Sequence, residues 1–352
     1  MTAKIPKIVV YNKKTAPSTG TGEAGKIAVI GAFDSTITDP KLYTSLSAAQ
    51  TDLKTTDGFD GCACLPYLFM NGATSILAVN ITTWSDDSTP VASKTVTAEN
   101  LAAALAKIKG EDWDILFVAA PITDAFIAII DAYLDATFEM KCPAGYVAAL
   151  TGGTDSANIT TAGLAGDHAY GLITQRYKVD GVLLSVLNTA AWYAGLIAGM
   201  SVGNTMTMKT LPGVTQVSPE LSFESGGAGK SLLEAGITTA RCVNRNRGRH
   251  VVVNSEQHNG LDLYMNRVRD YIVKNMALSD FLGERNRNVT LNEIKQEVAR
   301  VRYECVSTLD LCKDIKYKVS KKSADCVEIH LESIIFDGII TEIDVYVSVE
   351  VQ

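Results

Sequence analysis

The sequence predicts an α/β fold, α+β overall, with a layered α/β domain, a smaller C-terminal α+β domain and β-strands at both termini. Two patterns carry this prediction. Before residue 240, short apolar runs alternate with segments of helical periodicity, which is typical of a parallel sheet covered by helices. After residue 240, amphipathic helices are followed by long segments that alternate between apolar and polar residues.

The elements of the first part are expected in the order of a layered domain. Buried apolar runs predict strands, and apolar residues repeated every three or four positions predict helices. We expect strands at 26–31, 75–81 and 114–119, and helices at 99–108 and 123–138.

An uncharged stretch from Gly181 to Met208 has to be weighed as a membrane segment. It contains a GxxxG pair, Gly195 and Gly199, but also several polar residues, and no Lys/Arg cluster flanks it. We therefore predict a buried core helix here and no stable membrane insertion.

Two amphipathic helices are expected after residue 240. The first covers 261–277, with Arg267, Arg269 and Lys274 among its polar positions. The second covers 291–308, with Thr290 as its cap and Glu293 as the capping-box partner.

Both ends of the chain have the pattern of β-strands. Near the C-terminus, an alternating strand at 327–331 and the turn signal Asp337-Gly338 predict a hairpin with a second, longer strand. The apolar positions of that strand are Ile343, Val345, Val347, Val349 and Val351, and those of the N-terminal strand are Ile8, Val9, Val10 and Tyr11. Two alternatives are open: pairing within one subunit, or strand exchange between neighbours that builds a polymer.

Charge is distributed unevenly along the chain. Residues 1–240 hold 15 Lys/Arg against 22 Asp/Glu, residues 241–322 hold 17 against 10, and residues 323–352 hold none against 7. These patches either neutralise each other within one subunit or meet across a subunit contact. The net charge of −7 disfavours nucleic acid as a partner. We expect an arm at 1–20, a domain at 21–240 and a second domain at 241–352.

Three motifs suggest enzymes, and each fails a requirement of its chemistry. GGAGKS at 226–231 resembles a phosphate-binding loop, but Glu224 stands where that loop needs Gly. Ser201 lies in a GxSxG motif, yet a helix is expected before it, whereas a serine-hydrolase elbow needs a strand. Cys62 and Cys64 lack a second ligand pair. We expect no catalytic residue, metal site or cofactor, and keep a serine hydrolase using Ser201 as the alternative.

The seven cysteines are odd in number and widely scattered, and the first residues contain no apolar signal core. These features predict synthesis in a reducing cytoplasm.

Four blocks follow one another along most of the chain. They are GKIAVIGAFDSTITDPKLYTSLSAAQTDL from residue 25, LPYLFMNGATSILAVNIT from residue 65, AAWYAGLIAGMSV from residue 190 and EAGITTARCVNRNRGRHVVV from residue 234. Their order resembles the contractile tail sheath proteins of phages and of phage-tail-like bacteriocins. The final helices and the terminal strand also fit this family.

The resemblance implies a mechanical function rather than an enzymatic one. Subunits would be made in the bacterial cytoplasm and polymerise as a helical sleeve around an inner tail tube protein, with baseplate and tail-terminator proteins as further partners. The sleeve would then contract and drive the tube through a target cell envelope. The resemblance implies that strands 8–11 and 343–351 link neighbouring subunits, and that the charges of Arg267, Arg269 and Lys274 face the tube or another subunit.

Overall fold

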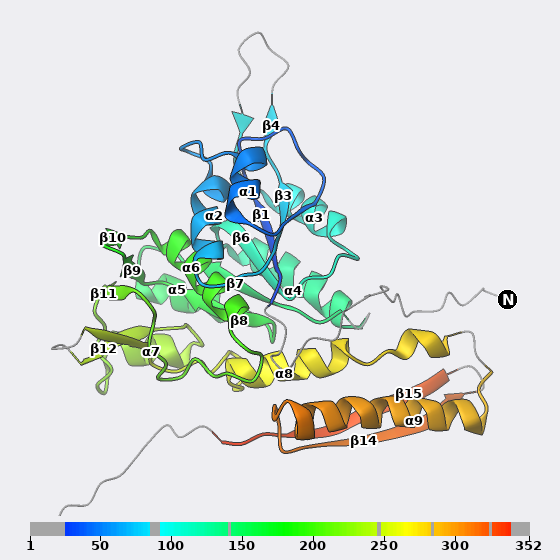
Figure 1. Cartoon of the computed structure of the whole chain (residues 1–352). Coiled ribbons are helices and arrows are strands. Elements are labelled where there is room, and N and C mark those ends of the chain that lie inside the picture. The colour runs from blue at the N-terminus through cyan, green and yellow to red at the C-terminus, as the bar shows by residue number, and fades with distance from the viewer. Residues whose placement is uncertain are drawn as a thin grey trace, which may run out of the picture.

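The structure is a computed structural model that describes residues 25–84, 92–139, 142–244, 248–282, 285–323 and 326–338. Within them, buried side chains form two hydrophobic cores. The larger core surrounds a six-stranded sheet, and the smaller one lies between two long helices and a β-hairpin. In Figure 1 the smaller unit, coloured yellow to red, lies along one side of the larger one. The fold is therefore mixed α/β, as the sequence predicts.

The six-stranded sheet has the order β2-β3-β1-β6-β7-β8. All neighbouring pairs are parallel except β2–β3. Every residue of β1, β3, β7 and β8 is buried, which explains why these strands are continuous apolar runs rather than alternating ones. The bounds are β1 Ile27–Gly31, β2 Lys41–Tyr43, β3 Ile76–Asn80, β6 Ile115–Pro121, β7 Gly145–Ala149 and β8 Ala169–Ile173.

Helices cover both faces of this sheet (Figure 1). α2 and α6 pack against each other on one face, and α3 and α4 on the other. The side chains of Thr97, Thr154 and Ser185 cap α3, α5 and α6. The bounds are α1 Leu46–Leu53, α2 Asp60–Met70, α3 Ala98–Lys107, α4 Asp124–Glu139, α5 Asp155–Ala162, α6 Val186–Gly199 and α7 Ala228–Glu234.

Short antiparallel sheets complete the large unit. β9 lies between β10 and β11, β12 pairs with β13, and β4 pairs with β5. The bounds are β4 Thr83–Trp84, β5 Ala92–Ser93, β9 Arg176–Val179, β10 Val182–Leu183, β11 Val214–Ser218, β12 Ala240–Asn244 and β13 Arg249–Val252.

The small unit, which we call the small domain, consists of α8, α9 and the hairpin β14–β15. Tyr264, Val268 and Ile272 of α8 pack into its core with apolar residues of α9 and β14. The bounds are α8 Leu263–Lys274, a 3₁₀ turn Leu278–Phe281, α9 Asn288–Tyr303, a π-helical turn Glu304–Thr308, β14 Asp314–Ser323 and β15 Cys326–Ile335.

The strands and helices expected in the first part are confirmed to within about two residues, a usual uncertainty of helix ends. Gly181–Met208 contains the predicted core helix, α6, of which 11 residues are buried. Among the described residues, no helix has both the length and the hydropathy needed to span a bilayer.

Two expectations for the second part need correction. α9 begins at Asn288 rather than 291, and Thr290 is not its cap, because the Thr290 hydroxyl donates to the carbonyl of Arg285 instead. The strand expected at 327–331 lies within β15, which pairs with the preceding strand β14, a strand that the sequence did not lead us to expect. The expected second strand at 343–351 lies outside the described residues.

The two cores divide at a different place from the change in sequence pattern. Ala240, Val252 and Leu263 belong to the large core, and the buried residues of the small core, apart from Val202, begin at Tyr264. The β12–β13 pair explains this difference, because it packs against β11 of the large unit. A functional domain boundary near 240 stays a prediction.

Candidate assembly interface

The hairpin β14–β15 separates an apolar face from a charged face. Tyr317 pairs with Leu331 and Val319 with Ile329, and these side chains belong to the small core. Lys318 pairs with His330, and both are exposed on the other face. The pleat of a strand produces this two-sided arrangement from an alternating sequence.

The hairpin is a sheet of only two strands in the part of the chain that the structure describes. The outer edge of each strand therefore has no partner strand there. Coverage of the apolar face is also unequal: Val319 of β14 is 7% exposed, whereas Val327, Ile329 and Leu331 of β15 are only partly buried. An open edge beside a half-covered apolar row is suited to the addition of a further strand.

The two strands of the hairpin carry opposite charges on their outward face. β14 exposes Lys316, Lys318 and Lys322. β15 carries Glu328, which pairs with Lys322 at 2.6 Å, and an exposed Glu332 in a bulge.

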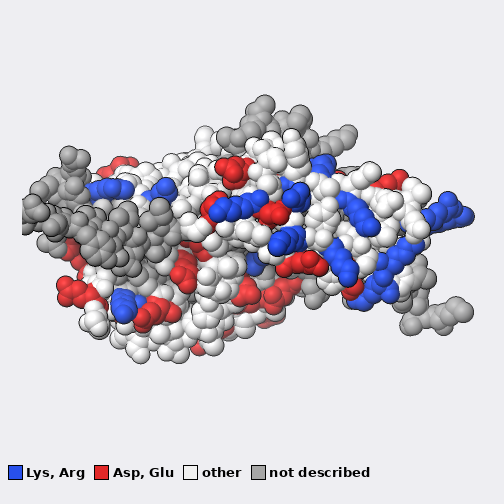
Figure 2. All heavy atoms as spheres, turned by 90° about the horizontal axis from the view of Figure 1, so that it is seen from below, with Lys and Arg blue, Asp and Glu red and all other residues white. Residues whose placement is uncertain are grey.

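Lys and Arg side chains also gather around the hairpin, at one end of the underside of the molecule (Figure 2). The exposed ones near it on α9 and the adjoining segments are Arg285, Arg287, Lys295, Arg300, Arg302 and Lys313. This basic surface belongs to the small domain.

A polar contact joins the small domain to the large unit. Arg267 and Lys274 lie on the side of α8 that faces the parallel sheet. The Arg267 guanidinium donates to the carbonyl oxygens of Met200 and Ser201 at 3.1 and 3.3 Å. The Lys274 ammonium lies 2.5 Å from Asp114 Oδ1 and 2.8 Å from Asp112 Oδ1.

These charged groups perturb one another. Burial alone would lower the pKa of Lys274, but the carboxylates of Asp114 and Asp112 outweigh it and raise that pKa. Burial would likewise raise the pKa of Asp114, but Lys274 lowers it below its usual value. Both partners are therefore charged at neutral pH, and the contact is an ion pair.

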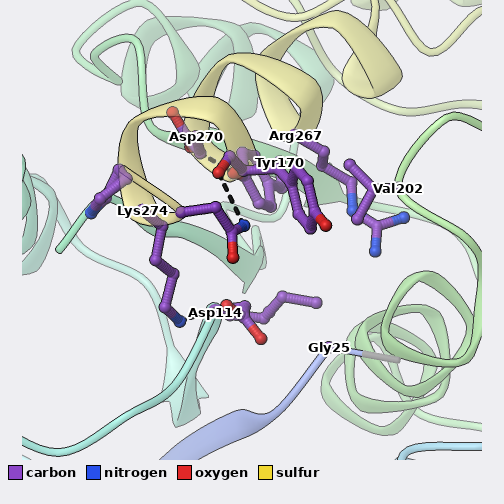
Figure 3. A pocket seen from close by; sticks show the side chains of 11 residues that line it. Gly25, Asp114, Tyr170, Val202, Arg267, Asp270 and Lys274 are labelled. Atoms are coloured by element: carbon purple, nitrogen blue, oxygen red, sulfur yellow. Dashed lines mark hydrogen bonds and ion pairs between the residues drawn. The ribbon is translucent and has the colours of Figure 1, made fainter. Parts of the chain in front are cut away.

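A cavity of about 50 Å³ lies within this contact. Asp114, Tyr170, Arg267, Asp270 and Lys274 line it, and Figure 3 shows their side chains converging from α8 and from the sheet. The Tyr170 hydroxyl donates to Asp270. A cavity of this size holds about one or two water molecules, so the site is a joint between two units rather than a ligand pocket.

The three α8 charges that sequence analysis singled out therefore have partners inside the chain. Arg267 is 6% exposed, and Arg269 donates to Asp270 at 2.8 Å while it lies over the ring of Phe138. Contact of Arg267, Arg269 and Lys274 with a tube or another subunit stays a prediction. Spacing alone did not reveal that the polar face of α8 lies against a second core.

The motifs that suggested enzymes do not form active sites in the described residues. Ser201 follows helix α6, and its carbonyl accepts from Arg267, so the strand before the serine that an elbow requires is missing. Asp262, a conceivable triad partner, instead accepts from the hydroxyls of Thr205, Thr207 and Ser255.

GGAGKS lies in the loop before α7 and in its first turns, where Lys230 is 3.8 Å from Glu234. Burial raises the pKa values of the Cys62 and Cys64 thiols. Across the part of the chain that the structure describes, no three His, Cys, Asp or Glu side chains are grouped to hold a metal ion.

Comparison with known proteins gives the fold a family context. Residues 94–255 match the family model of the phage tail sheath protein central domain. Residues 94–255 therefore resemble a tail sheath central domain. No curated protein matches the sequence significantly.

Solved sheath structures resemble almost the whole chain. The sheath tail protein of Desulfitobacterium hafniense is 14% identical, with a TM-score of 0.68 over 91% of this chain and 95% of that one. The sheath tail protein Lin1278 of Listeria innocua is 12% identical, with a TM-score of 0.60 over 86% and 90%. The contracted helical sheath of the anti-feeding prophage is 13% identical, with a TM-score of 0.65 over 98% and 99%. The chain thus has a sheath protein fold.

Proposed function

We propose that this chain is the repeating subunit of a contractile tail sheath, which polymerises around an inner tube and contracts to drive the tube through a cell envelope. The observation that carries this proposal is the match of a sheath central domain within a fold that resembles sheath proteins over 91% or more of the chain in two comparisons. Large shared coverage favours a common architecture for the whole subunit. The serine-hydrolase alternative has no comparable support.

Strand exchange would link the subunits. The hairpin β14–β15 has open edges in the described residues, and the chain carries two β-prone segments, 8–11 and 343–351. A strand added to an edge is held by main-chain hydrogen bonds, each worth about 0.5–1.5 kcal/mol net. Such links tolerate rotation of neighbouring domains, because only a short segment of single chain connects each exchanged strand to its own domain.

The partners follow from this role. The exposed Lys and Arg side chains of the small domain offer a surface for an acidic inner tube, and baseplate and tail-terminator proteins would bind the two ends of the sleeve. The subunit would be synthesised in the bacterial cytoplasm and assembled into a tail or a phage-tail-like particle. Contraction would draw on many small contact changes between two packed arrangements and would need no cofactor.

Electron microscopy of the purified chain tests the proposal. We expect the full-length protein to form sleeves or tubes, and a variant that ends at residue 339 to stay soluble, folded and unpolymerised. Circular dichroism of the truncated chain supplies the control for folding. Tubes of normal appearance from the truncated chain would contradict the linking role of the C-terminal segment.

A further inference from the structure

We propose that the large unit holds a binding site for a neutral saccharide, in a groove between the loop after β1, the end of α1 and the exposed Trp84 of β4. The groove has a volume of about 390 Å³, which lies within the usual range of small-ligand sites. In Figure 1, β4 lies at the end of the large unit away from the small domain. Among the residues that line the groove are Asp34, Thr36, Thr51, Asp52, Lys54 and Trp84.

The position of the groove follows from the parallel sheet. β1 and β3 are parallel neighbours, so the loops that follow them leave the sheet at the same edge. The Ser35 carbonyl in the first loop accepts from the side chain of Asn80, the last residue of β3, at 2.6 Å and from that of Trp84 at 3.3 Å. These bonds tie the two loops together and preform the groove. The carboxyl ends of parallel strands are also where open α/β sheets bind their ligands.

An exposed indole ring forms one wall of the groove. Trp84 is 38% exposed, although its N–H is bound to Ser35 and its ring lies 6.3 Å from the ring of Phe59. A held aromatic ring that stays open to solvent offers a flat apolar surface at little cost in conformational entropy. The C–H face of a pyranose ring is suited to stacking on such a surface.

The charged groups of the described lining are paired. The Lys54 ammonium lies 3.6 Å from Asp34 Oδ1, and the Lys41 ammonium lies 2.5 Å from Asp52 Oδ2. The pairs cancel in net charge, so the groove does not favour an ion. Their carboxylate oxygens and ammonium N–H groups can still accept and donate further hydrogen bonds. A neutral ligand with many hydroxyl groups meets both kinds of partner, because each hydroxyl donates and accepts.

The backbone at Lys54 supports a ligand site at this place. Lys54 has φ 60° and ψ −174°, a conformation that is essentially confined to Gly, while its N–H donates to the Gln50 carbonyl at 3.0 Å. Strained residues of this kind cluster at ligand-binding sites. The strain here orients the end of α1 toward the loop after β1, where Lys54 meets Asp34.

Tryptophan fluorescence of the full-length chain tests the site. The other two tryptophans, Trp113 and Trp192, are 6% and 0% exposed, so changes in emission on adding a ligand report on Trp84. We expect a saturable change with at least one of glucose, galactose, mannose, N-acetylglucosamine, maltose and cellobiose, at up to about 100 mM. No saturable change with any of them, and no saturation transfer to them in NMR spectra, would overturn the proposal.

Substitution of Trp84 locates the bound sugar. We expect Trp84→Ala to weaken binding by about tenfold and Trp84→Phe to weaken it less, because a phenyl ring retains part of the stacking surface. Tyr303→Ala is the matched control, since it removes an aromatic ring that is 67% exposed on α9, and it should leave binding unchanged. Isothermal titration calorimetry measures all three variants. Unchanged affinity of Trp84→Ala, or an equal loss in Tyr303→Ala, would refute a site in this groove.

The charge of the ligand provides a second test. The amino and uronic acid derivatives of the bound sugar keep its ring and add one positive or one negative charge. We expect both to bind more weakly than the neutral sugar, because each meets a like charge in the paired groups of the groove. Tighter binding of either derivative would contradict a neutral ligand. Polymerisation is measured separately, so failure of these titrations leaves the proposed sheath function untouched.

Discussion

Charged side chains of α8 join the two cores of this protein. Arg267 and Lys274 of α8 form hydrogen bonds and ion pairs with the large unit, while Val268 and Ile272 of the same helix belong to the small core. One helix thus has an apolar face toward one unit and a polar face toward the other. Polar contacts are strongly directional, so the joint fixes the orientation of the small domain.

Loss of one partner from this joint should lower stability. We predict that Lys274→Met reduces the free energy of unfolding by about 1–3 kcal/mol, because the Asp114 and Asp112 carboxylates lose their partner in a partly buried site. Lys313→Met is the matched control, since its pair with Asp337 is 59% and 70% exposed and should contribute under about 1 kcal/mol. Urea unfolding measures the free energy of unfolding of both variants. Equally small losses in the two variants would argue against a stabilising role of the Lys274 ion pairs.

The same ion pair predicts a dependence on acid. The pKa of Asp114 is lower in the folded chain than its usual value of 3.8, so its stabilising effect is present above that pH and is lost as the pH falls through the lower, folded value. The pKa of Lys274 is raised, so its effect is present at neutral pH and is lost only in strong alkali. We expect wild type to lose more stability than Asp114→Asn between pH 7 and pH 3, as measured by urea unfolding. Equal losses of stability in wild type and Asp114→Asn over this pH range would contradict the role of the ion pair.

At the scale of elements, close packing of α2 and α6 organises one face of the parallel sheet. A Cβ added at Gly195 would lie 2.4 Å from the carbonyl oxygen of Leu68, and one at Gly199 would lie 2.2 Å from that of Asn71. The GxxxG pair of the sequence therefore serves contact between two helices within the fold.

Substitution of this glycine tests the packing. We predict that Gly195→Ala lowers the free energy of unfolding by about 1–3 kcal/mol, because the new methyl group meets rigid backbone and this overpacking outweighs the higher helix propensity of Ala. Gly338→Ala, where a Cβ has no neighbour within 4 Å among the described residues, should have little effect. A thermal melt of each variant provides the measurement, and a more stable Gly195→Ala would refute the close contact.

Elements with strong apolar patterns were predictable from sequence, and elements defined by long-range contacts were not. β1, β3 and β6 are continuous apolar runs, and α3 has a Thr97 cap, so local signals sufficed. β14 was missed although Ile315, Tyr317 and Val319 alternate with Lys316 and Lys318, because this alternating run is short and its partner strand was not recognised. The internal partners of Lys274 lie about 160 residues away in the chain, beyond the reach of any local pattern.

For the whole molecule, the account depends on subunits that complete one another. The large unit has the buried core of a self-sufficient domain, whereas the small domain ends in a two-stranded hairpin with open edges in its described part. Two-stranded hairpins are marginally stable alone. Neighbouring copies in a polymer would provide the further strands.

A reconstruction of the assembled polymer by cryo-electron microscopy, at a resolution that traces individual strands, tests this claim most directly. The account predicts that residues 343–351 of a neighbouring copy add a strand to the hairpin β14–β15. Density in which the C-terminal segment of each copy folds back onto its own hairpin would contradict it.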